Sequence, residues 1–273
     1  HIWDAREAVK SRIEETRANR FLHSLNPDGT FSIPLRYYAA HTGRFGGAEK
    51  LNLQNLPRGS KLRTALQSPA GQLMYIADLS NIEARMLAWL AKEQDLVDAF
   101  ATGRDVYCEF ASQIYGREIT KADKLERYVG KTAILGLGYG MGAPKFKMTL
   151  KSGSPSVEVT DSTALAIVSQ YRAMYPNIPM LWNGCKNLLY AMMNRSSLGM
   201  NYGPLTVDTN AIRLPNDMHL KYPQLTYQSG QFVYFSGKSA IRTHGPRMTE
   251  NIVQALARIV ITEQMLEIQN LPE

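Results

Sequence analysis

The chain has 273 residues, of which 44% are hydrophobic and 20% are charged, so it can bury a sizeable core and is not expected to be disordered. Its net charge of +7 favours a polyanionic partner that binds through its phosphates. The sequence contains no run of about 18 apolar residues and no secretion signal at its start, so we expect an intracellular protein with no membrane partner.

The first predicted element is an amphipathic helix over residues 2–25, which the turn residues at 26–29 end. Apolar and polar residues then alternate over 31–37. This alternation predicts a strand, and Pro34 places that strand at the edge of a sheet. The short apolar run at 73–77 predicts a buried strand that ends directly on Asp78.

A helix is expected after Asp78, because Ile82, Met86 and Leu90 recur on one side. The chain from about 90 to 190 is then predicted to be mostly helical, including a helix over 161–175 that Pro176 stops. We expect loops and short strands over 195–240 and a last helix over about 249–269.

The two cysteines, Cys108 and Cys185, lie far apart and lack the spacing of metal ligands. A disulfide framework and a zinc site are therefore disfavoured. We predict that both side chains are buried, reduced thiols.

Positive charge is concentrated between residues 116 and 151, where eight cationic side chains outnumber three carboxylates. This segment is the part of the chain best suited to an anion. The cations are Arg117, Lys121, Lys124, Arg127, Lys131, Lys145, Lys147 and Lys151, and the carboxylates are Glu118, Asp123 and Glu126.

The segment 78–85 places Asp78 where a buried strand would meet a helix. A carboxylate held there can bind a divalent cation, and phosphoryl transfer needs such an ion to bridge protein oxygens and phosphates. A purely structural alternative stays open. Ser80 and Glu83 have the spacing of a capping box, and Asp78 could merely stabilise the helix start.

The segment 124–140 carries Arg127, Lys131, Leu135 and Tyr139 at intervals of four, so on a helix they form one stripe. Two neighbouring cations can contact adjacent phosphates of a triphosphate, and the apolar positions beyond them can pack on a base. The alternative is a solvated basic face beside ordinary core positions.

Glycines alternate with other residues over 136–142, but they follow a helix and lack the spacing of a dinucleotide fingerprint, so we reject that fold. They are better suited to ending the helix and to letting a ligand or template base approach. The polar segments 40–45 and 52–58 carry amides and cations that could sense duplex geometry in the minor groove, or could form an ordinary polar loop.

Taken in this order, the segments resemble the A-family DNA polymerases of bacteria and phages. The resemblance covers nearly the whole chain. Its matching motifs are Thr-Gly-Arg at 42–44, Asn-Leu-Gln-Asn-Leu-Pro at 52–57, the metal-binding motif at 78–85, the fingers-helix motif at 127–140, and further similarity from 171–176 to 250–254.

The resemblance implies a catalytic centre in which Asp78 and the Leu79 carbonyl hold Mg²⁺, with Mn²⁺ as the alternative ion. Glu83 would exclude ribonucleotides by crowding the 2′ position of the sugar. Arg127 and Lys131 would grip the incoming dNTP, with Lys131 placed to protonate the departing pyrophosphate. The chemistry is in-line attack of a primer 3′-hydroxyl on the α-phosphate.

The resemblance also implies two sets of contacts, one with the nucleotide and one with the primer–template DNA. Tyr139 would pack near the nascent base pair, and Arg44, Gln54 and Gln254 would follow the minor groove. The full nucleotide-binding set is Leu79, Ser80, Asn81, Glu83, Arg127, Lys131, Leu135 and Tyr139, and the DNA-binding set is Arg44, Asn52, Gln54, Asn55, Gly140 and Gln254.

The chain departs from the family pattern at several positions. Leu135 replaces the usual aromatic residue, which predicts altered nucleotide discrimination. Tyr107 stands where many members have a phosphate-binding His, and Glu250 and Asn251 precede Gln254 where many keep Arg and Asn. These departures leave the roles of Glu250 and Asn251 open.

The family places its second metal-binding Asp in a His-Asp hairpin after the last helix, and this sequence has no His-Asp pair. Asp208 and Asp217 are weak substitutes. Two-metal catalysis needs carboxylates that bring the ions to about 3.5–4 Å, so the polypeptide alone is expected to be feeble or inactive. We expect a gene fragment, a truncated polypeptide or half of a split enzyme whose carboxy-terminal partner supplies the missing strand.

The expected fold class is α+β, with an antiparallel-sheet palm and a largely helical fingers insertion, as an incomplete right-hand polymerase fold. The palm would comprise residues 1–88 and 239–273, and the fingers 89–238. The resemblance implies the cytoplasm of a bacterial or phage-infected cell. It also requires that Asp78 faces the Arg127–Lys131 pair across a cleft that holds one triphosphate.

Two other functions stay open from sequence. A single-subunit RNA polymerase shares the palm and the fingers helix, although Glu83 argues against it because a bulky acid there should exclude ribose. A non-catalytic primer–template binding module would carry the DNA contacts without the chemistry.

Overall fold

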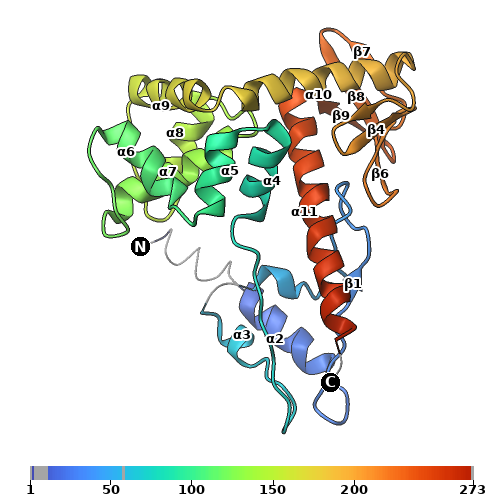
Figure 1. Ribbon diagram of the computed structural model, residues 1–273. Helices are drawn as coiled ribbons and strands as arrows, with labels where there is room; N and C mark the ends of the chain where they lie inside the picture. Colours follow the sequence, from blue (N-terminus) through green and yellow to red (C-terminus); the bar gives the residue numbers. More distant parts are fainter. Residues whose placement is uncertain (1, 3–11, 57–58, 272–273) are drawn as a thin grey trace. The chain divides into compact units, whose positions relative to one another are not determined.

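The computed structural model describes residues 2, 12–56 and 59–271 (Figure 1). The chain divides into two compact units, His1–Asp78 and Leu79–Glu273. Each unit has its own buried apolar cluster. No helix in the described ranges is both long enough and apolar enough to cross a membrane.

The first unit opens with α2 (Ile13–His23), which confirms part of the helix predicted over 2–25, whereas residues 3–11 lie outside the described residues. The turn that follows forms as predicted, since the Gly29 amide donates to the Asn26 carbonyl at 2.9 Å. The strand predicted over 31–37 is shortened to β1 (Leu35–Arg36), which pairs antiparallel with β2 (Gly46–Gly47). Strand β1 begins only after Pro34, because proline has no backbone N–H to donate to a neighbouring strand.

The core of the first unit is small. Phe21 of α2 packs with Leu51 and Leu56, and the rings of Phe21 and Phe31 lie 5.3 Å apart. The short helices of this unit are η1 (Leu53–Asn55) and α3 (Lys61–Thr64).

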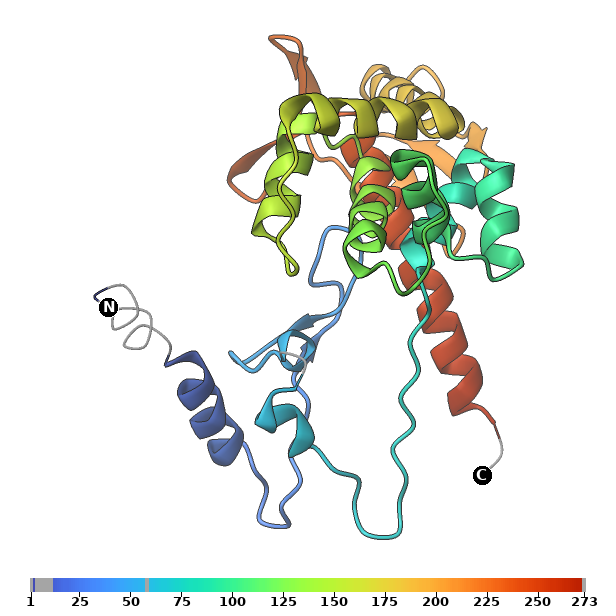
Figure 2. The ribbon, with the colours of Figure 1, turned by 90° about the vertical axis from the view of Figure 1, so that its left-hand side faces the viewer.

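The prediction of a buried strand over 73–77 is wrong. The side chains of Leu73, Tyr75 and Ile76 are 78%, 89% and 81% exposed, and the segment runs as an irregular extended loop (Figure 2). No backbone hydrogen bond joins residues 73–78 to another described residue. A strand needs a neighbour for its amides and carbonyls, and an apolar run does not supply one.

The second unit is built mainly from helices, which confirms the prediction for 90–190. Its last long helix, α11, begins four residues before the predicted position, because Pro246 fits a first helical turn and His244 accepts the Arg247 amide at 3.4 Å. The helices are α4 (Ile82–Ala91), α5 (Gln94–Ala101), α6 (Val106–Tyr115), α7 (Lys124–Leu137), α8 (Ala143–Ser152), α9 (Asp161–Met174), α10 (Asn177–Asn194) and α11 (Gly245–Gln269).

Two small sheets lie between α10 and α11 in the sequence, where short strands were predicted. One has the order β3-β4-β5-β6 and the other β7-β8-β9, and every strand pairing is antiparallel. The helices and antiparallel sheets confirm the α+β class. The strands are β3 (Asn201–Tyr202), β4 (Leu205–Asp208), β5 (Ala211–Arg213), β6 (His219–Lys221), β7 (Thr226–Gln228), β8 (Gln231–Ser236) and β9 (Ser239–Thr243).

The main core joins helices from the whole second unit. Helix α11 packs against α4 and α10 (Figure 1), and its buried residues all lie between Gly245 and Ile259. Both cysteines are buried free thiols, as predicted, and burial raises the pKa of Cys185 to about 11.

Helices α6 and α7 approach so closely that only glycine fits at one position between them. A Cβ on Gly130 would collide with the backbone carbonyl oxygen of Tyr107. The backbone of α6 cannot yield as a side chain could, so Gly130 fixes the distance between the two helices.

Replacing Gly130 with Ala should therefore force α6 and α7 apart and lower the free energy of unfolding by about 1–3 kcal/mol. Gly136→Ala is the matched control on the same helix, because its Cβ would meet only the flexible end of Met141. That variant should be neutral or more stable by up to about 1 kcal/mol. Urea unfolding followed by circular dichroism measures both, and equal stability of the two variants would contradict the close approach.

Candidate active site

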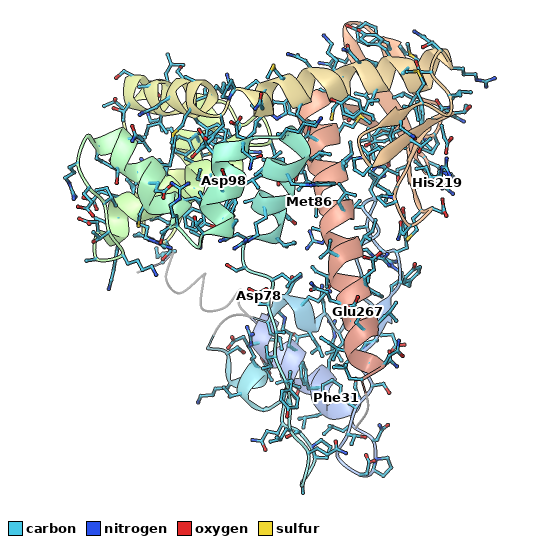
Figure 3. All side chains as sticks on the ribbon, in the orientation of Figure 1. Phe31, Asp78, Met86, Asp98, His219 and Glu267 are labelled. Atoms are coloured by element: carbon cyan, nitrogen blue, oxygen red, sulfur yellow. The ribbon has the colours of Figure 1, made fainter. Side chains whose placement is uncertain are left out.

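The turn that leads into α4 carries the predicted metal-binding motif. Asp78 is exposed and ends the first unit, just before this turn (Figure 3). Helix α4 begins after Asn81, which has a φ of 56° and makes no side-chain cap. The capping box proposed for Ser80 and Glu83 does not form. Instead, Arg85 donates to the Ser80 carbonyl at 3.0 Å and holds the turn.

A chain of polar contacts joins this turn to α6 and α7. The Tyr107 hydroxyl donates to the Asn81 side-chain oxygen. The guanidinium of Arg127 lies over the Tyr107 ring, 5.3 Å from its centroid. Arg127 also donates from Nε and Nη2 to one Asp105 carboxylate oxygen, each at 2.9 Å. Asn81 and Arg127, from two separate predicted motifs, are therefore brought together within one unit.

Asp105 is the residue of this site that the sequence reasoning missed. It caps α6 by accepting from the amides of Tyr107 and Cys108, each at 3.2 Å. Burial alone would raise the pKa of this carboxyl, but the hydrogen bonds from Arg127 and Cys108 outweigh it and hold the pKa below its ordinary value. Asp105 stands immediately before an apolar helical segment, so the sequence does predict it as a helix N-cap. Its pairing with Arg127, 22 residues away, is not readable from the sequence.

The stripe predicted on α7 is confirmed only up to Leu135. Arg127 is partly buried, Lys131 is exposed and Leu135 is 40% exposed. Lys131 has no ion pair with any of the described residues. Helix α7 ends at Leu137, so Tyr139 lies in the following turn and not on the helix, because Gly138 closes the last turn.

The charge of Glu83, the predicted sugar-selecting residue, nevertheless acts on Tyr139. Its phenol oxygen is buried and has no hydrogen-bond partner within the described part of the chain. Burial raises the pKa of Tyr139, and the carboxylates of Glu83 and Glu250 raise it further. Acidic side chains of α4 and α11 therefore act electrostatically on this phenol.

The turn after α7 is pressed against the start of α11. Gly140 has a φ of 77°, and a Cβ there would lie 2.6 Å from a side-chain carbon of Pro246. This close packing explains why glycine stands at 140. A DNA contact at the same position stays a prediction.

The predicted DNA-binding residue of α11, Gln254, is partly buried and donates to Glu250 at 3.4 Å. Asn251 is buried and donates to the Tyr222 hydroxyl at 3.2 Å. The Asn251 side chain therefore holds α11 to Tyr222, the residue that follows β6, which gives Asn251 a structural role.

The first unit exposes Arg44, Gln54 and Asn55, three of the side chains predicted to contact DNA. The side chain of Asn52 caps η1 by accepting the Gln54 amide at 3.0 Å. Asn52 therefore shapes the loop that presents its neighbours to solvent.

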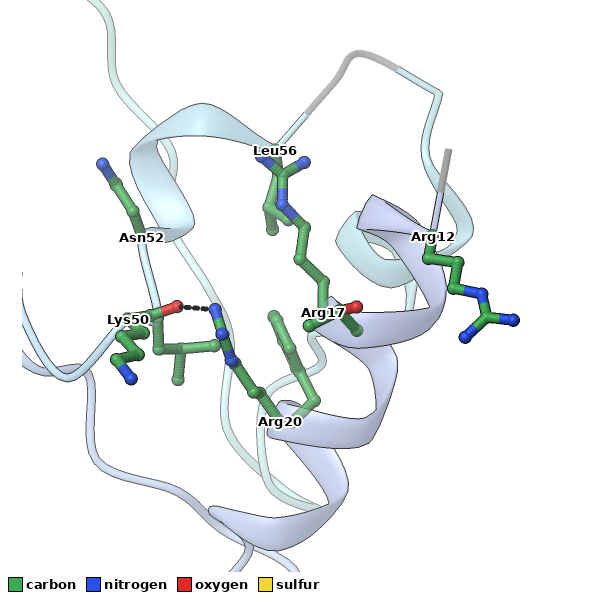
Figure 4. Close-up of a pocket in the computed structure, with 9 residues that line it drawn as sticks. Arg12, Arg17, Arg20, Lys50, Asn52 and Leu56 are labelled. Atoms are coloured by element: carbon green, nitrogen blue, oxygen red, sulfur yellow. Dashed lines mark hydrogen bonds between the residues drawn. The ribbon is translucent and has the colours of Figure 1, made fainter. Parts of the chain in front are cut away.

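A second cationic site lies in the first unit and was not predicted. Arg12, Arg17, Arg20 and Lys50 line a pocket of about 380 Å³, which we call the basic pocket (Figure 4). Arg20 donates to the Lys50 carbonyl at 2.8 Å, which fixes one wall. Arg17 and Arg20 are spaced as neighbours on one helix face, a signal that the sequence does contain.

The donors available for a divalent cation are oxygens. Asp78 offers an exposed carboxylate, and the Leu79 carbonyl accepts only a long hydrogen bond of 3.4 Å from Ile82. Among the described residues, no three His, Cys, Asp or Glu side chains cluster as a metal site. One carboxylate and one carbonyl suit an ion such as Mg²⁺ that keeps waters and takes further oxygens from phosphates.

Comparison with known proteins decides the family. The model of DNA polymerase family A matches residues 2–193. The chain belongs to DNA polymerase family A. The resemblance inferred from the motifs is thereby confirmed. Members of this family generally use divalent metal ions, and the oxygen donors at 78–79 are compatible with one.

Two relatives show how much of this family the chain covers. It is 32% identical to a DNA polymerase I of Pseudomonas aeruginosa over 173 residues, which are 62% of this chain and 18% of the relative. It is 26% identical to a DNA polymerase of Bacillus phage SP02 over 321 aligned positions, covering 96% of this chain and 48% of the relative. The chain thus spans less than half the length of either relative.

The fold comparison agrees with the family. The polymerase domain of Pol1 from M. smegmatis, solved with DNA primer-template and dNTP, matches with a TM-score of 0.59 at 21% identity. The match covers 92% of this chain and 37% of the other. It supports the α+β fold of this chain.

The Asp105–Arg127 pair predicts a dependence of stability on pH. Because the pKa of Asp105 is lowered by folding, its contribution is fully present above its ordinary value of 3.8 and is lost as the pH falls below it. Asp105→Asn should lower the free energy of unfolding by about 1–3 kcal/mol at pH 7, with the difference from wild type shrinking below about pH 4.

The matched control is Asp217→Asn, which removes an ion pair to Arg213 from a carboxylate that is 83% exposed. It should change the stability by at most about 1 kcal/mol. Urea unfolding at several pH values measures both variants. An Asp105→Asn variant that loses the same stability at pH 3 as at pH 7 would contradict the assigned role.

Proposed function

We propose that this protein acts in template-directed DNA synthesis, transferring a deoxynucleotide from dNTP to a primer 3′-hydroxyl. The observation that carries the proposal is the polar chain from Asn81 through Tyr107 to Arg127. It brings the start of α4 beside the cationic face of α7 within one unit. In this proposal residues 1–88 and 239–273 form the palm and 89–238 the fingers.

Arg127 and Lys131 have different physical properties as triphosphate ligands. Asp105 binds the Nε and Nη2 atoms of Arg127, so the guanidinium is oriented before a substrate arrives. The remaining N–H donors of the guanidinium can bind a phosphate. Lys131 is exposed and sits one turn further along α7, where it can follow the β- and γ-phosphates and donate a proton to the leaving pyrophosphate.

Glu83 and Tyr139 form the sugar and base end of the same site. The carboxylate of Glu83 raises the pKa of the Tyr139 phenol, which supports a common site for the two groups. A carboxylate there would oppose a 2′-hydroxyl, and the Tyr139 ring would support the nascent base pair. Leu135 is 40% exposed between these groups and the cations, so it offers the base an aliphatic contact and no aromatic stacking.

Asp78 and the Leu79 carbonyl would hold Mg²⁺, which neutralises the phosphates and activates the primer hydroxyl when it is bound. Two-metal chemistry needs a further carboxylate, and the sequence has no His-Asp pair to supply it. A carboxy-terminal polymerase segment that contains such a pair is therefore part of the proposal as a partner.

The decisive experiment mixes the chain with a carboxy-terminal family A fragment that carries the His-Asp hairpin and measures extension of a labelled primer on a DNA template. The mixture should extend the primer with dNTP and Mg²⁺. Asp78→Ala should reduce the rate by about 10³-fold while leaving duplex affinity unchanged.

Asp161→Ala is the control for that experiment, because Asp161 is an exposed acid paired with Lys147. It should extend the primer at the wild-type rate. A mixture that binds primer–template but never extends it, under any dNTP and metal conditions, would favour a binding module and refute the polymerase.

Lys131→Ala tests the triphosphate site separately. Losing one charge-assisted contact should lower kcat/KM for dNTP by about 10- to 100-fold in the same mixture. Lys121→Ala, which removes an exposed cation from the turn before α7, should leave kcat/KM within about twofold. Equal effects of the two substitutions would show that only the general positive charge of the segment matters.

A further inference from the structure

A pocket of about 480 Å³ lies between α10, the β7-β8-β9 sheet and the start of α11, and the function proposed above does not use it. We call it the sheet pocket. Its lining includes Trp182 and Lys186 of α10, Tyr227 of β7, Phe232 of β8, and Arg242 and Thr243 of β9. All of its lining residues belong to the second unit.

The strand register explains why aromatic groups gather on this wall. Tyr227 pairs with Phe232, and Phe232 pairs with Thr243, so the three side chains stand on one face of the sheet. On α10, Trp182, Lys186 and Tyr190 recur every four residues. Tyr190 meets the sheet face, with ring centroids 4.6 Å from Phe232 and 5.3 Å from Tyr227.

The pocket is positively charged. Lys186 and Arg242 are exposed at its rim, and the described residues that line it include no Asp or Glu. The carboxylate of Glu250, one turn into α11, lies 3.9 Å from Arg247. Two cations beside exposed aromatic surface form the combination that binds a nucleotide through its phosphate and its base.

One polar group in the wall lacks a partner. The hydroxyl of Thr243 is buried, and no described residue hydrogen-bonds to it. The oxygen is enclosed by the wall, so a buried water molecule is the group that would satisfy it.

The sheet pocket is connected to the turn that follows α7. Trp182 donates from its indole nitrogen to the Gly138 carbonyl at 2.9 Å, and Pro246 packs on Gly140. The pocket therefore lies just beyond Tyr139, on the α10 and α11 side of the nucleotide site. A template base that pairs at Tyr139 is continuous with the next, unpaired nucleotides of the same strand.

From these observations we infer that the sheet pocket binds the unpaired template strand ahead of the nascent base pair, with Lys186 and Arg242 on phosphates and a base against Tyr227. The ligand class is single-stranded nucleic acid, and the contact is independent of base identity. This inference rests on the proposed function for the direction of the strand.

The test measures binding of the 273-residue chain to fluorescein-labelled dT12 by anisotropy at several salt concentrations, with a blunt hairpin duplex as second ligand. Lys186→Gln with Arg242→Gln should weaken dT12 binding about tenfold near 0.1 M salt and make the log–log salt slope shallower by about 1.4, since each lost phosphate contact on a single strand accounts for about 0.7. Affinity for the blunt duplex should not change.

The matched control is Lys221→Gln with Lys238→Gln, which removes the same charge from exposed positions. Lys238 lies in the turn that joins β8 and β9, at the far end of the same sheet. The last strand pair before this turn, Ser236–Ser239, is four residues from the Phe232–Thr243 pair, which is about 13 Å. Equal losses of dT12 affinity in the control and the pocket variant would overturn the inference.

Tyr227 tests the base contact. Tyr227→Leu should weaken dT12 binding about fivefold or more, and Tyr227→Phe should keep it, because only the aromatic face is needed. If both variants bind as wild type, no base stacks there and the inference fails. If free dTMP displaces dT12 with an equal dissociation constant, the pocket is a mononucleotide site and the strand assignment is overturned.

These outcomes are separable from a failure of the proposed function. Extension and its dependence on Asp78 and Lys131 are measured at the primer terminus with dNTP. A polymerase whose dT12 binding ignores Lys186 and Arg242 would refute only the sheet pocket.

Discussion

The pairing of Arg127 with Asp105 is the interaction on which the arrangement of the proposed nucleotide site depends. One carboxylate caps α6, orients a guanidinium on α7 and, through the ring of Tyr107 between them, fixes the hydroxyl that meets Asn81. An exposed salt bridge would contribute little, but this pair is partly shielded from water and closes a network that spans three segments. The close contact at Gly130 is what lets α6 and α7 come near enough to form it.

The network also gives the two cations of α7 different surroundings, which suit different roles in the proposed function. A guanidinium that is partly buried and held by Asp105 would lose little freedom when a phosphate binds, so in the proposed function it would set the position of the substrate. An exposed lysine such as Lys131 keeps its conformational freedom until the phosphates arrive, which in the proposed function suits a group that must follow charge as it develops.

Local periodicity was enough to predict the helices of the second unit and the cationic face of α7, because each helix buries one side regardless of its partners. The sequence could not show the Asp105–Arg127 pair, the basic pocket or the sheet pocket, since these depend on tertiary approach or strand register. The strand at 73–77 failed for the related reason that strand formation is decided by neighbours. Tyr139 was placed on a helix that in fact ends at Leu137, where glycines at every second position weaken helical propensity.

The exposed segment from Leu73 to Ala77 has a consequence for handling the protein. It is apolar and uncharged, contains no proline and leaves its amides and carbonyls open. Such a segment can form an intermolecular sheet with its counterpart in another copy, and the tendency grows with concentration. Self-association of the purified chain is therefore expected at these five residues next to the proposed metal ligand, and a strand that paired with them would protect the protein from it.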